Sequence, residues 1–257
     1  GGLVGSEMCI RDSLEGVDLF ADDFYAHWTT EHTPTIETSQ PAPGRFAATY
    51  QRLAECGATS ILSVHVAESM SGTLNSARLA ADMATVPVRL VDTGTASFGV
   101  ACCAWAAAEA IGEGADLDEA EAVASARAAQ LRTSFVVGVP QLIDGSGRAV
   151  GLDVEDAAGA GVPVLAMSGA ELSILVTAED LDTAVGAMVA DALACPPSSA
   201  AGLRIAVGTS DVSSRPLAAA LTEALSGHVQ VAEVVEYRIG PSVGAHTGPG
   251  TAGLFVF

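Results

Sequence analysis

Short apolar runs alternate with longer amphipathic or alanine-rich stretches through the first half of the chain. The apolar runs are rich in β-branched residues, which is typical of buried strands, and they cover residues 59–67, 86–99 and 134–139. The intervening stretches have helical spacing or alanine-rich composition and predict helices over residues 16–28, 72–84, 100–114 and 116–132. Strands that alternate with helices favour a parallel α/β sheet with helices on both faces.

A further helix is expected after an extended polar loop. Two prolines follow residues 38–40 and keep this loop extended. Phe46, Tyr50 and Leu53 then recur at helical spacing, and Gly57 ends the helix. The polar loop therefore leads directly into a helix with one apolar face.

The second half of the chain predicts a second α/β unit. Strands are expected at residues 162–167, 171–176, 204–210, 229–240 and 250–257. Helices are expected at residues 178–194 and 214–227, with a turn-rich linker over residues 195–202. We therefore expect an α/β fold of two α/β domains. The N-terminal domain, residues 13–134, is a parallel sheet with helices on both faces, and the C-terminal domain, residues 135–257, is a mixed sheet with helices.

Residues 1–12 lack a clear element pattern, and they do not begin with Met. They also lack the apolar core of a signal peptide. We interpret them as a non-native or truncated segment ahead of the first domain.

The composition excludes several classes of partner. The 257 residues include 11 arginines, no lysine and 31 acidic residues, which give a net charge of −20. Nucleic acid is not expected as a partner because the chain lacks a basic surface to neutralise phosphates. No run reaches the ~18 apolar residues of a membrane span, so no membrane insertion is expected. Five cysteines without a CxxC spacing indicate neither a disulfide framework nor a metal site, and they fit the reducing cytoplasm.

Three kinds of chemistry are conceivable for the hydroxyl cluster at residues 69–73. A serine hydrolase is disfavoured because Gly-x-Ser-x-Gly is absent and His65 lies inside an apolar strand, where a core histidine is expected. A phosphate loop is disfavoured because there is neither a Walker motif nor a lysine. Ser71, Gly72 and Thr73 stand where a helix begins, and hydroxyls together with backbone N–H groups bind a single carboxylate there. An ordinary helix cap explains the same residues and stays open.

The end of the chain is rich in glycine and proline. Residues 240–250 contain four glycines and two prolines around His246 and Thr247. We expect a loop that is either a tight structural turn or a wall close to a ligand.

Four motifs together resemble the DegV family of bacterial fatty-acid-binding proteins: TSQPAPGRF, SMSGTLNSA, VDTGTASFG and GPSVGAHTGPGTAGLF. The resemblance extends from about residue 15 to the C-terminus. It implies an EDD fold of two α/β domains with a long acyl chain buried between or beneath them. It further implies a cytoplasmic, non-enzymatic protein of phospholipid metabolism that presents a long-chain fatty acid to a separate fatty acid kinase. No cofactor is expected besides the fatty acid ligand.

The resemblance also implies the site residues. Thr38 and Ser71 would bind the fatty acid carboxylate, together with Gly72 and Thr73. The nearby residues would be Ser39, Ser97, Arg148, His246 and Thr247. The alternative is an enzyme of the same architecture that acts on a small acid or a phosphate compound, and a third possibility is a fragment that binds lipid poorly because its first strand is missing.

Two departures from the family pattern concern charge. Glu68 stands next to the SMSGT motif, where an inward-pointing carboxylate would oppose the binding of an anion. Residues 162–180 lack the basic side chains usual in the second domain, which bears on docking to a kinase.

Overall fold

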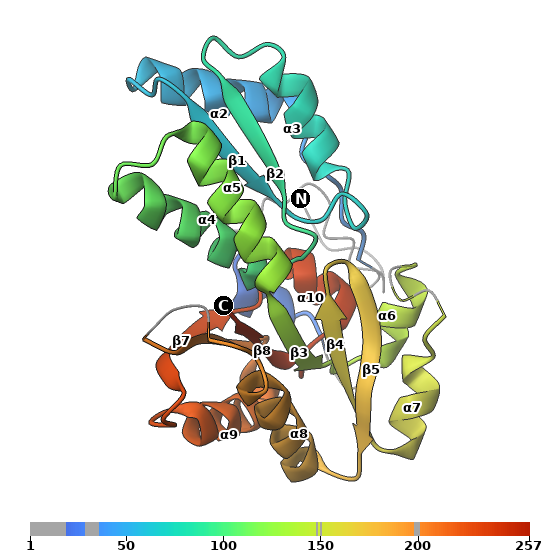
Figure 1. The fold of residues 1–257 in the computed structure, drawn as a ribbon. Coiled ribbons are helices and arrows are strands. Elements are labelled where there is room, and N and C mark those ends of the chain that lie inside the picture. Colours follow the sequence, from blue (N-terminus) through green and yellow to red (C-terminus); the bar gives the residue numbers. More distant parts are fainter. Residues whose placement is uncertain (1–18, 29–35, 148, 150, 198–200) are drawn as a thin grey trace, which may run out of the picture. The chain divides into compact units, whose positions relative to one another are not determined.

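The computed structural model describes residues 19–28, 36–147, 149, 151–197 and 201–257 (Figure 1). The chain forms two compact units. The large unit comprises the residues before Ser39, Arg132–Ala166 and Leu172–Val256, and the small unit comprises Ser39–Leu131, Met167–Glu171 and Phe257. The domain boundary between residues 134 and 135 stays a prediction, and the expected N-terminal segment 1–12 lies outside the described residues.

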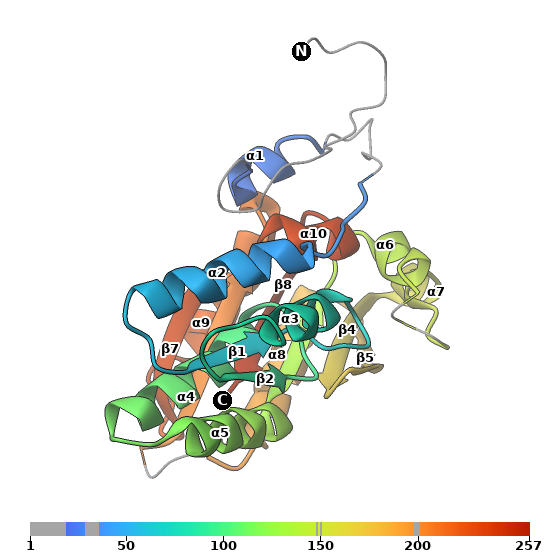
Figure 2. The ribbon, with the colours of Figure 1, turned by 90° about the horizontal axis from the view of Figure 1, so that it is seen from above.

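The small unit is built on two parallel strands, β1 (Ile61–His65) and β2 (Val88–Asp92), paired from Ile61↔Val88 to His65↔Asp92. Its helices are α2 (Pro43–Glu55), α3 (Thr73–Ala81), α4 (Phe98–Gly112) and α5 (Leu117–Gln130). Helices α2 and α3 cover one face of the strands, and α4 and α5 cover the other (Figure 2). Because β1 and β2 run parallel, the loops that lead into α3 and α4 leave from the same edge of the sheet.

Small side chains allow α4 and α5 to pack closely. Cys103 and Ala107 on α4 and Ala120 and Ala124 on α5 are at most 2% exposed. Burial raises the pKa of the Cys103 thiol to about 11, although Arg127 opposes this shift. Cys103 is therefore a protonated core residue, as the alanine-rich pattern around it predicts.

The large unit contains a six-stranded mixed sheet in the order β5-β4-β3-β8-β6-β7. In chain order these strands are β3 (Arg132–Val136), β4 (Val162–Ser168), β5 (Glu171–Ala178), β6 (Leu203–Thr209), β7 (Val231–Arg238) and β8 (Ala252–Val256). Strand β8 runs antiparallel to both β3 and β6, whereas β6 and β7 are parallel. The expected fold class, with a parallel sheet and a mixed sheet, is confirmed.

One strand lies in a different sheet from the one that its place in the strand–helix alternation predicts. The sequence pattern predicts that the run after α5 is a third strand of the parallel sheet, but β3 pairs with β8 from Arg132↔Val256 to Val136↔Ala252. The reason is that every strand offers the same backbone donors and acceptors, so an apolar run does not specify its partner. Pairing with β8 makes β3 an interior strand of the large sheet.

Two helices, α8 (Leu181–Leu193) and α9 (Arg215–Leu225), lie side by side on the large sheet (Figure 1). Met188 of α8 and Leu221 of α9 form one core with Leu254 of β8, and all three are at most 1% exposed. The remaining helices are α1 (Ala21–Tyr25), α6 (Pro140–Gly145), α7 (Val154–Ala160), the 3₁₀ turn η1 (Val212–Ser214) and α10 (Pro241–Thr247). Within the described parts of the chain, no helix is long and apolar enough to span a bilayer.

Candidate functional site

Three residues predicted to bind a carboxylate, Ser71, Gly72 and Thr73, lie at the start of α3 in the small unit. We call them the carboxylate seat. Gly72 is the N-cap residue of this helix and has no side chain to bond the free N–H groups. The Ser71 hydroxyl accepts a hydrogen bond from the Thr73 backbone N–H at 3.3 Å and lies 2.7 Å from the Thr73 hydroxyl. The structure thus places two hydroxyls, half-buried, beside helix N–H groups that favour an anion.

Hydrogen bonds fix the seat to the neighbouring loop. The Ala67 N–H donates to the Thr95 carbonyl at 2.8 Å, and Thr93 donates from its hydroxyl to the His65 carbonyl at 2.8 Å. Asp92 accepts from the backbone N–H of Gly94 at 2.9 Å. The first two bonds hold the β1–α3 and β2–α4 connections together at one edge of the sheet, and the third is within the β2–α4 connection.

Glu68 does not oppose an anion in the way that its position suggests. Both terminal nitrogens of Arg78 lie 3.1 Å from Glu68 Oε1, and the two side chains are about half exposed. The carboxylate charge is therefore balanced by an arginine at the surface of the small unit.

Ser97 and Ser39 lie in loops of the small unit. Ser97 is the N-cap of α4 with φ 56° and ψ −137°, and it is the one non-glycine residue with positive φ among those described. Such a backbone conformation is strained for a residue with a Cβ. Ser39 is exposed in the extended loop before α2. Whether either serine contacts a ligand stays a prediction.

Thr38 and His246, two other residues of the predicted site, lie together in the large unit. The Thr38 hydroxyl and His246 Nε2 are 3.1 Å apart, which joins two motifs separated by 208 positions. His246 lies on helix α10, so the expected loop at residues 240–250 was partly wrong. The reason is that Pro241 is at the first turn of the helix, where its missing N–H costs nothing. The helix ends at Gly248, which has φ 75°.

Aromatic side chains position α10. Tyr25 donates from its hydroxyl to the Ile239 carbonyl at 3.1 Å. A Cβ on Gly244 would overlap the Tyr25 hydroxyl and lie 2.8 Å from the Phe24 ring. Gly244 is thus required for the close approach of α1 to the helix that carries His246.

Of the two remaining predicted residues, the structure describes Thr247 but not Arg148. The Thr247 side chain is buried, and its hydroxyl donates to the Val243 carbonyl at 3.3 Å, which ties it to its own helix. Arg148 lies outside the described residues.

Sequence reasoning missed Asp211, which holds the segment after α10. Its Oδ1 accepts from the Gly250 N–H at 2.8 Å and from the Ser210 and Ser213 hydroxyls at 2.9 Å. Burial alone would raise the pKa of Asp211, but these hydrogen bonds lower it. The signal in the sequence is the polar run TSDVSS at the end of a strand.

A serine and a histidine do lie together, in the core of the small unit. Ser63 Oγ is 2.7 Å from His65 Nε2 and accepts a hydrogen bond from the Tyr50 hydroxyl at 2.9 Å. His65 is 5% exposed beside the Phe46 ring, and burial lowers its pKa while Asp92 opposes that shift. The pair lies under α2 and links this helix to β1, which confirms the expectation of a core histidine.

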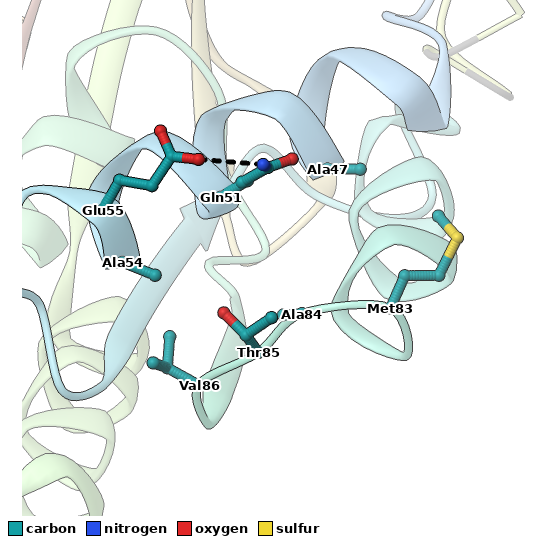
Figure 3. A pocket seen from close by; sticks show the side chains of 8 residues that line it. All are labelled: Ala47, Gln51, Ala54, Glu55, Met83, Ala84, Thr85 and Val86. Atoms are coloured by element: carbon teal, nitrogen blue, oxygen red, sulfur yellow. Dashed lines mark hydrogen bonds between the residues drawn. The ribbon is translucent and has the colours of Figure 1, made fainter.

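A surface groove of about 530 Å³ lies between α2 and the connection from α3 to β2 (Figure 3). Gln51 donates to Glu55 across one wall at 2.9 Å, and none of the predicted binding residues line the groove. The described residues also contain no group of three or more His, Cys, Asp or Glu side chains that could hold a metal ion.

The comparisons with known proteins agree with the motifs. The family model described as "Uncharacterised protein, DegV family" matches residues 11–257. The DegV domain-containing protein SCO2569 of Streptomyces coelicolor is 34% identical over 223 residues, which cover 86% of this chain and 78% of that protein. The DegV domain-containing protein Mb2440c of Mycobacterium bovis is 28% identical over 247 residues, which cover 95% and 85%.

Solved structures share the fold. The structure described as "Fatty Acid Binding of a DegV family Protein from Thermus thermophilus" has a TM-score of 0.82 at 26% identity and covers 95% of this chain and 86% of that one. The DegV family protein Cg2579 from Corynebacterium glutamicum has a TM-score of 0.76 at 25% identity, with coverages of 86% and 82%. This chain belongs to the DegV family.

Proposed function

We propose that this protein binds a long-chain fatty acid and holds its carboxylate with Thr38 and Ser71, assisted by Gly72 and Thr73. The observation that carries the proposal is the hydrogen bond between Thr38 and His246, because it joins two motifs that the resemblance assigns to the head group. The hydroxyl pair at the start of α3 supports it from the small unit. The Thermus thermophilus relative, described as binding fatty acid, supports the ligand class.

The energetics suit such a ligand. A fatty acid has about 15 methylenes, and each contributes roughly 0.8 kcal/mol when buried, or about 12 kcal/mol before the cost of binding is subtracted. The tail therefore supplies most of the affinity, and a few neutral donors suffice to orient the head group.

The wider role follows from the same resemblance. We propose a non-enzymatic cytoplasmic carrier without a cofactor, which presents the carboxylate to a separate fatty acid kinase. Neutral hydroxyls fit this role because they bind a carboxylate and also accommodate its conversion to an acyl phosphate.

Two measurements test the proposal. Native mass spectrometry of protein purified from cells should detect a co-purifying fatty acid. The double variant Thr38→Ala, Ser71→Ala should bind hexadecanoate at least tenfold more weakly than the wild type, which corresponds to about 1.4 kcal/mol. Unchanged affinity in a folded double variant would contradict the proposed head-group residues.

A further inference from the structure

The side chain of Gln40 lies directly against the predicted carboxylate seat of the small unit. A Cβ built on Gly72 would lie 2.6 Å from Gln40 Oε1, 2.7 Å from Cδ and 2.8 Å from Nε2. All three atoms of the carboxamide are therefore near Gly72, and a residue with a side chain would displace them. The contact places a polar group beside Gly72, the N-cap of α3, which stands between Ser71 and Thr73 in the chain.

The Gln40 carboxamide is free to bind a ligand. Among the described residues it has no hydrogen-bond partner, whereas the two seat hydroxyls already lie 2.7 Å from each other. A carboxamide offers two N–H donors and one acceptor, and a carboxylate offers only acceptors. An N–H donor beside Gly72 thus complements an ionised head group.

Prolines restrict the main chain that carries Gln40. Pro41 follows Gln40 directly and Pro43 begins α2, so the main chain between them is held extended. The Gln40 side chain is exposed, but its restricted main chain loses less entropy on binding than a flexible loop would.

We propose that Gln40 determines head-group specificity by donating from Nε2 to the carboxylate, and that Gly72 is required to leave room for the carboxamide. This inference rests on the proposed function, since it names a further residue of the same site.

Two substitutions of Gln40 provide the test, with hexadecanoate and hexadecanamide as the two probes in a calorimetric titration at pH 8. Gln40→Ala should weaken hexadecanoate binding about tenfold, the effect of one hydrogen bond to a charged group. Gln40→Glu should weaken hexadecanoate binding further, because two carboxylates then face each other. This variant should prefer hexadecanamide, because its N–H₂ group donates a hydrogen bond that the Glu carboxylate accepts. Lowering the pH should restore hexadecanoate binding to Gln40→Glu as the pair takes up a proton.

Two further variants separate this contact from general damage. Gly72 has φ −69°, so Gly72→Ala is unstrained in its backbone and acts mainly by pushing the carboxamide away. Gly72→Ala should lose about as much affinity for hexadecanoate as Gln40→Ala does. The double variant Gln40→Ala, Gly72→Ala should bind hexadecanoate no more weakly than either single variant. Gln51→Ala, which removes an exposed glutamine on α2, should leave binding unchanged.

The outcomes are distinguishable. If the wild type binds neither probe, the proposed function fails. If the wild type binds hexadecanoate but Gln40→Ala and Gln40→Glu keep its affinity and preference, only the role of Gln40 fails. Tighter binding of hexadecanoate by Gln40→Ala would also overturn the proposed role of Gln40, since the carboxamide would then compete with the ligand.

Discussion

Asp211 provides a sharp test of how much the charge of one carboxylate, which bonds both η1 and the segment after α10, contributes to stability. Replacing it with asparagine keeps the shape of the side chain but removes the charge and one acceptor oxygen. Oδ1 can be replaced by the amide oxygen, whereas Oδ2, which accepts from the Ser213 backbone N–H at 3.3 Å and its hydroxyl at 2.9 Å, becomes an NH₂ group. The backbone N–H then faces another donor and loses its partner.

The expected magnitude follows from these contacts. Hydrogen bonds to a charged group contribute about 1.5–3 kcal/mol each, and the Asp211 carboxylate is only partly buried, so a total loss of about 2 kcal/mol is expected. For a chain of this size, about 2–4 °C of Tm corresponds to each kcal/mol. Asp211→Asn should therefore lower Tm by about 4–8 °C in differential scanning calorimetry at pH 7.

The pH dependence provides the check on the mechanism. The folded pKa of Asp211 is lowered, so its stabilisation is present above the unfolded value of about 3.9 and is lost as the pH falls through the folded value. The gap in Tm between the wild type and Asp211→Asn should be full at pH 7 and should close below about pH 4. Asp180→Asn, at the exposed N-cap of α8, is the matched control and should lower Tm less. An Asp211→Asn gap that is absent at pH 7, or that persists unchanged at pH 3, would refute this reasoning.

We make three other predictions. Gly138→Ala should lower stability by about 3 kcal/mol, because its Cβ would overlap the Pro249 carbonyl oxygen and force the backbone to move; an unchanged Tm would contradict the close approach. His246→Ala and Arg148→Ala should each change hexadecanoate affinity by less than about tenfold yet slow phosphorylation by a cognate kinase much more, and phosphorylation at the wild-type rate would assign both a scaffold role. The pure protein should turn over neither a generic ester nor ATP, and ester turnover that disappears in Ser63→Ala would reveal a nucleophile in the Ser63–His65 pair.

Local pattern was sufficient for most helices and strands. Phe46 and Tyr50 recur at helical spacing and face the core of the small unit from α2, while Gly57, with φ +96°, follows where the helix ends. Apolar runs likewise predicted the strands of both sheets. These features depend on neighbours within a few residues, so the period of apolar side chains is enough to reveal them.

Motif position also indicated the candidate residues, but not their chemistry. The sequence alone placed Ser71 and Thr73 at a helix start, because a hydroxyl cluster after a strand is typical of that position. It did not reveal that α10 is a helix, because a short glycine- and proline-rich segment has no apolar period of its own.

Only the tertiary structure decided the long-range pairings. Strand β3 joins β8 rather than the parallel strands, and Thr38 meets His246 across 208 positions. The Gln40 carboxamide lies on Gly72, and Asp211 accepts from Gly250, although no local pattern links either pair. The physical reason is that backbone hydrogen-bonding groups are alike in every strand and loop, so packing of the whole chain, not the sequence nearby, selects which of them come together.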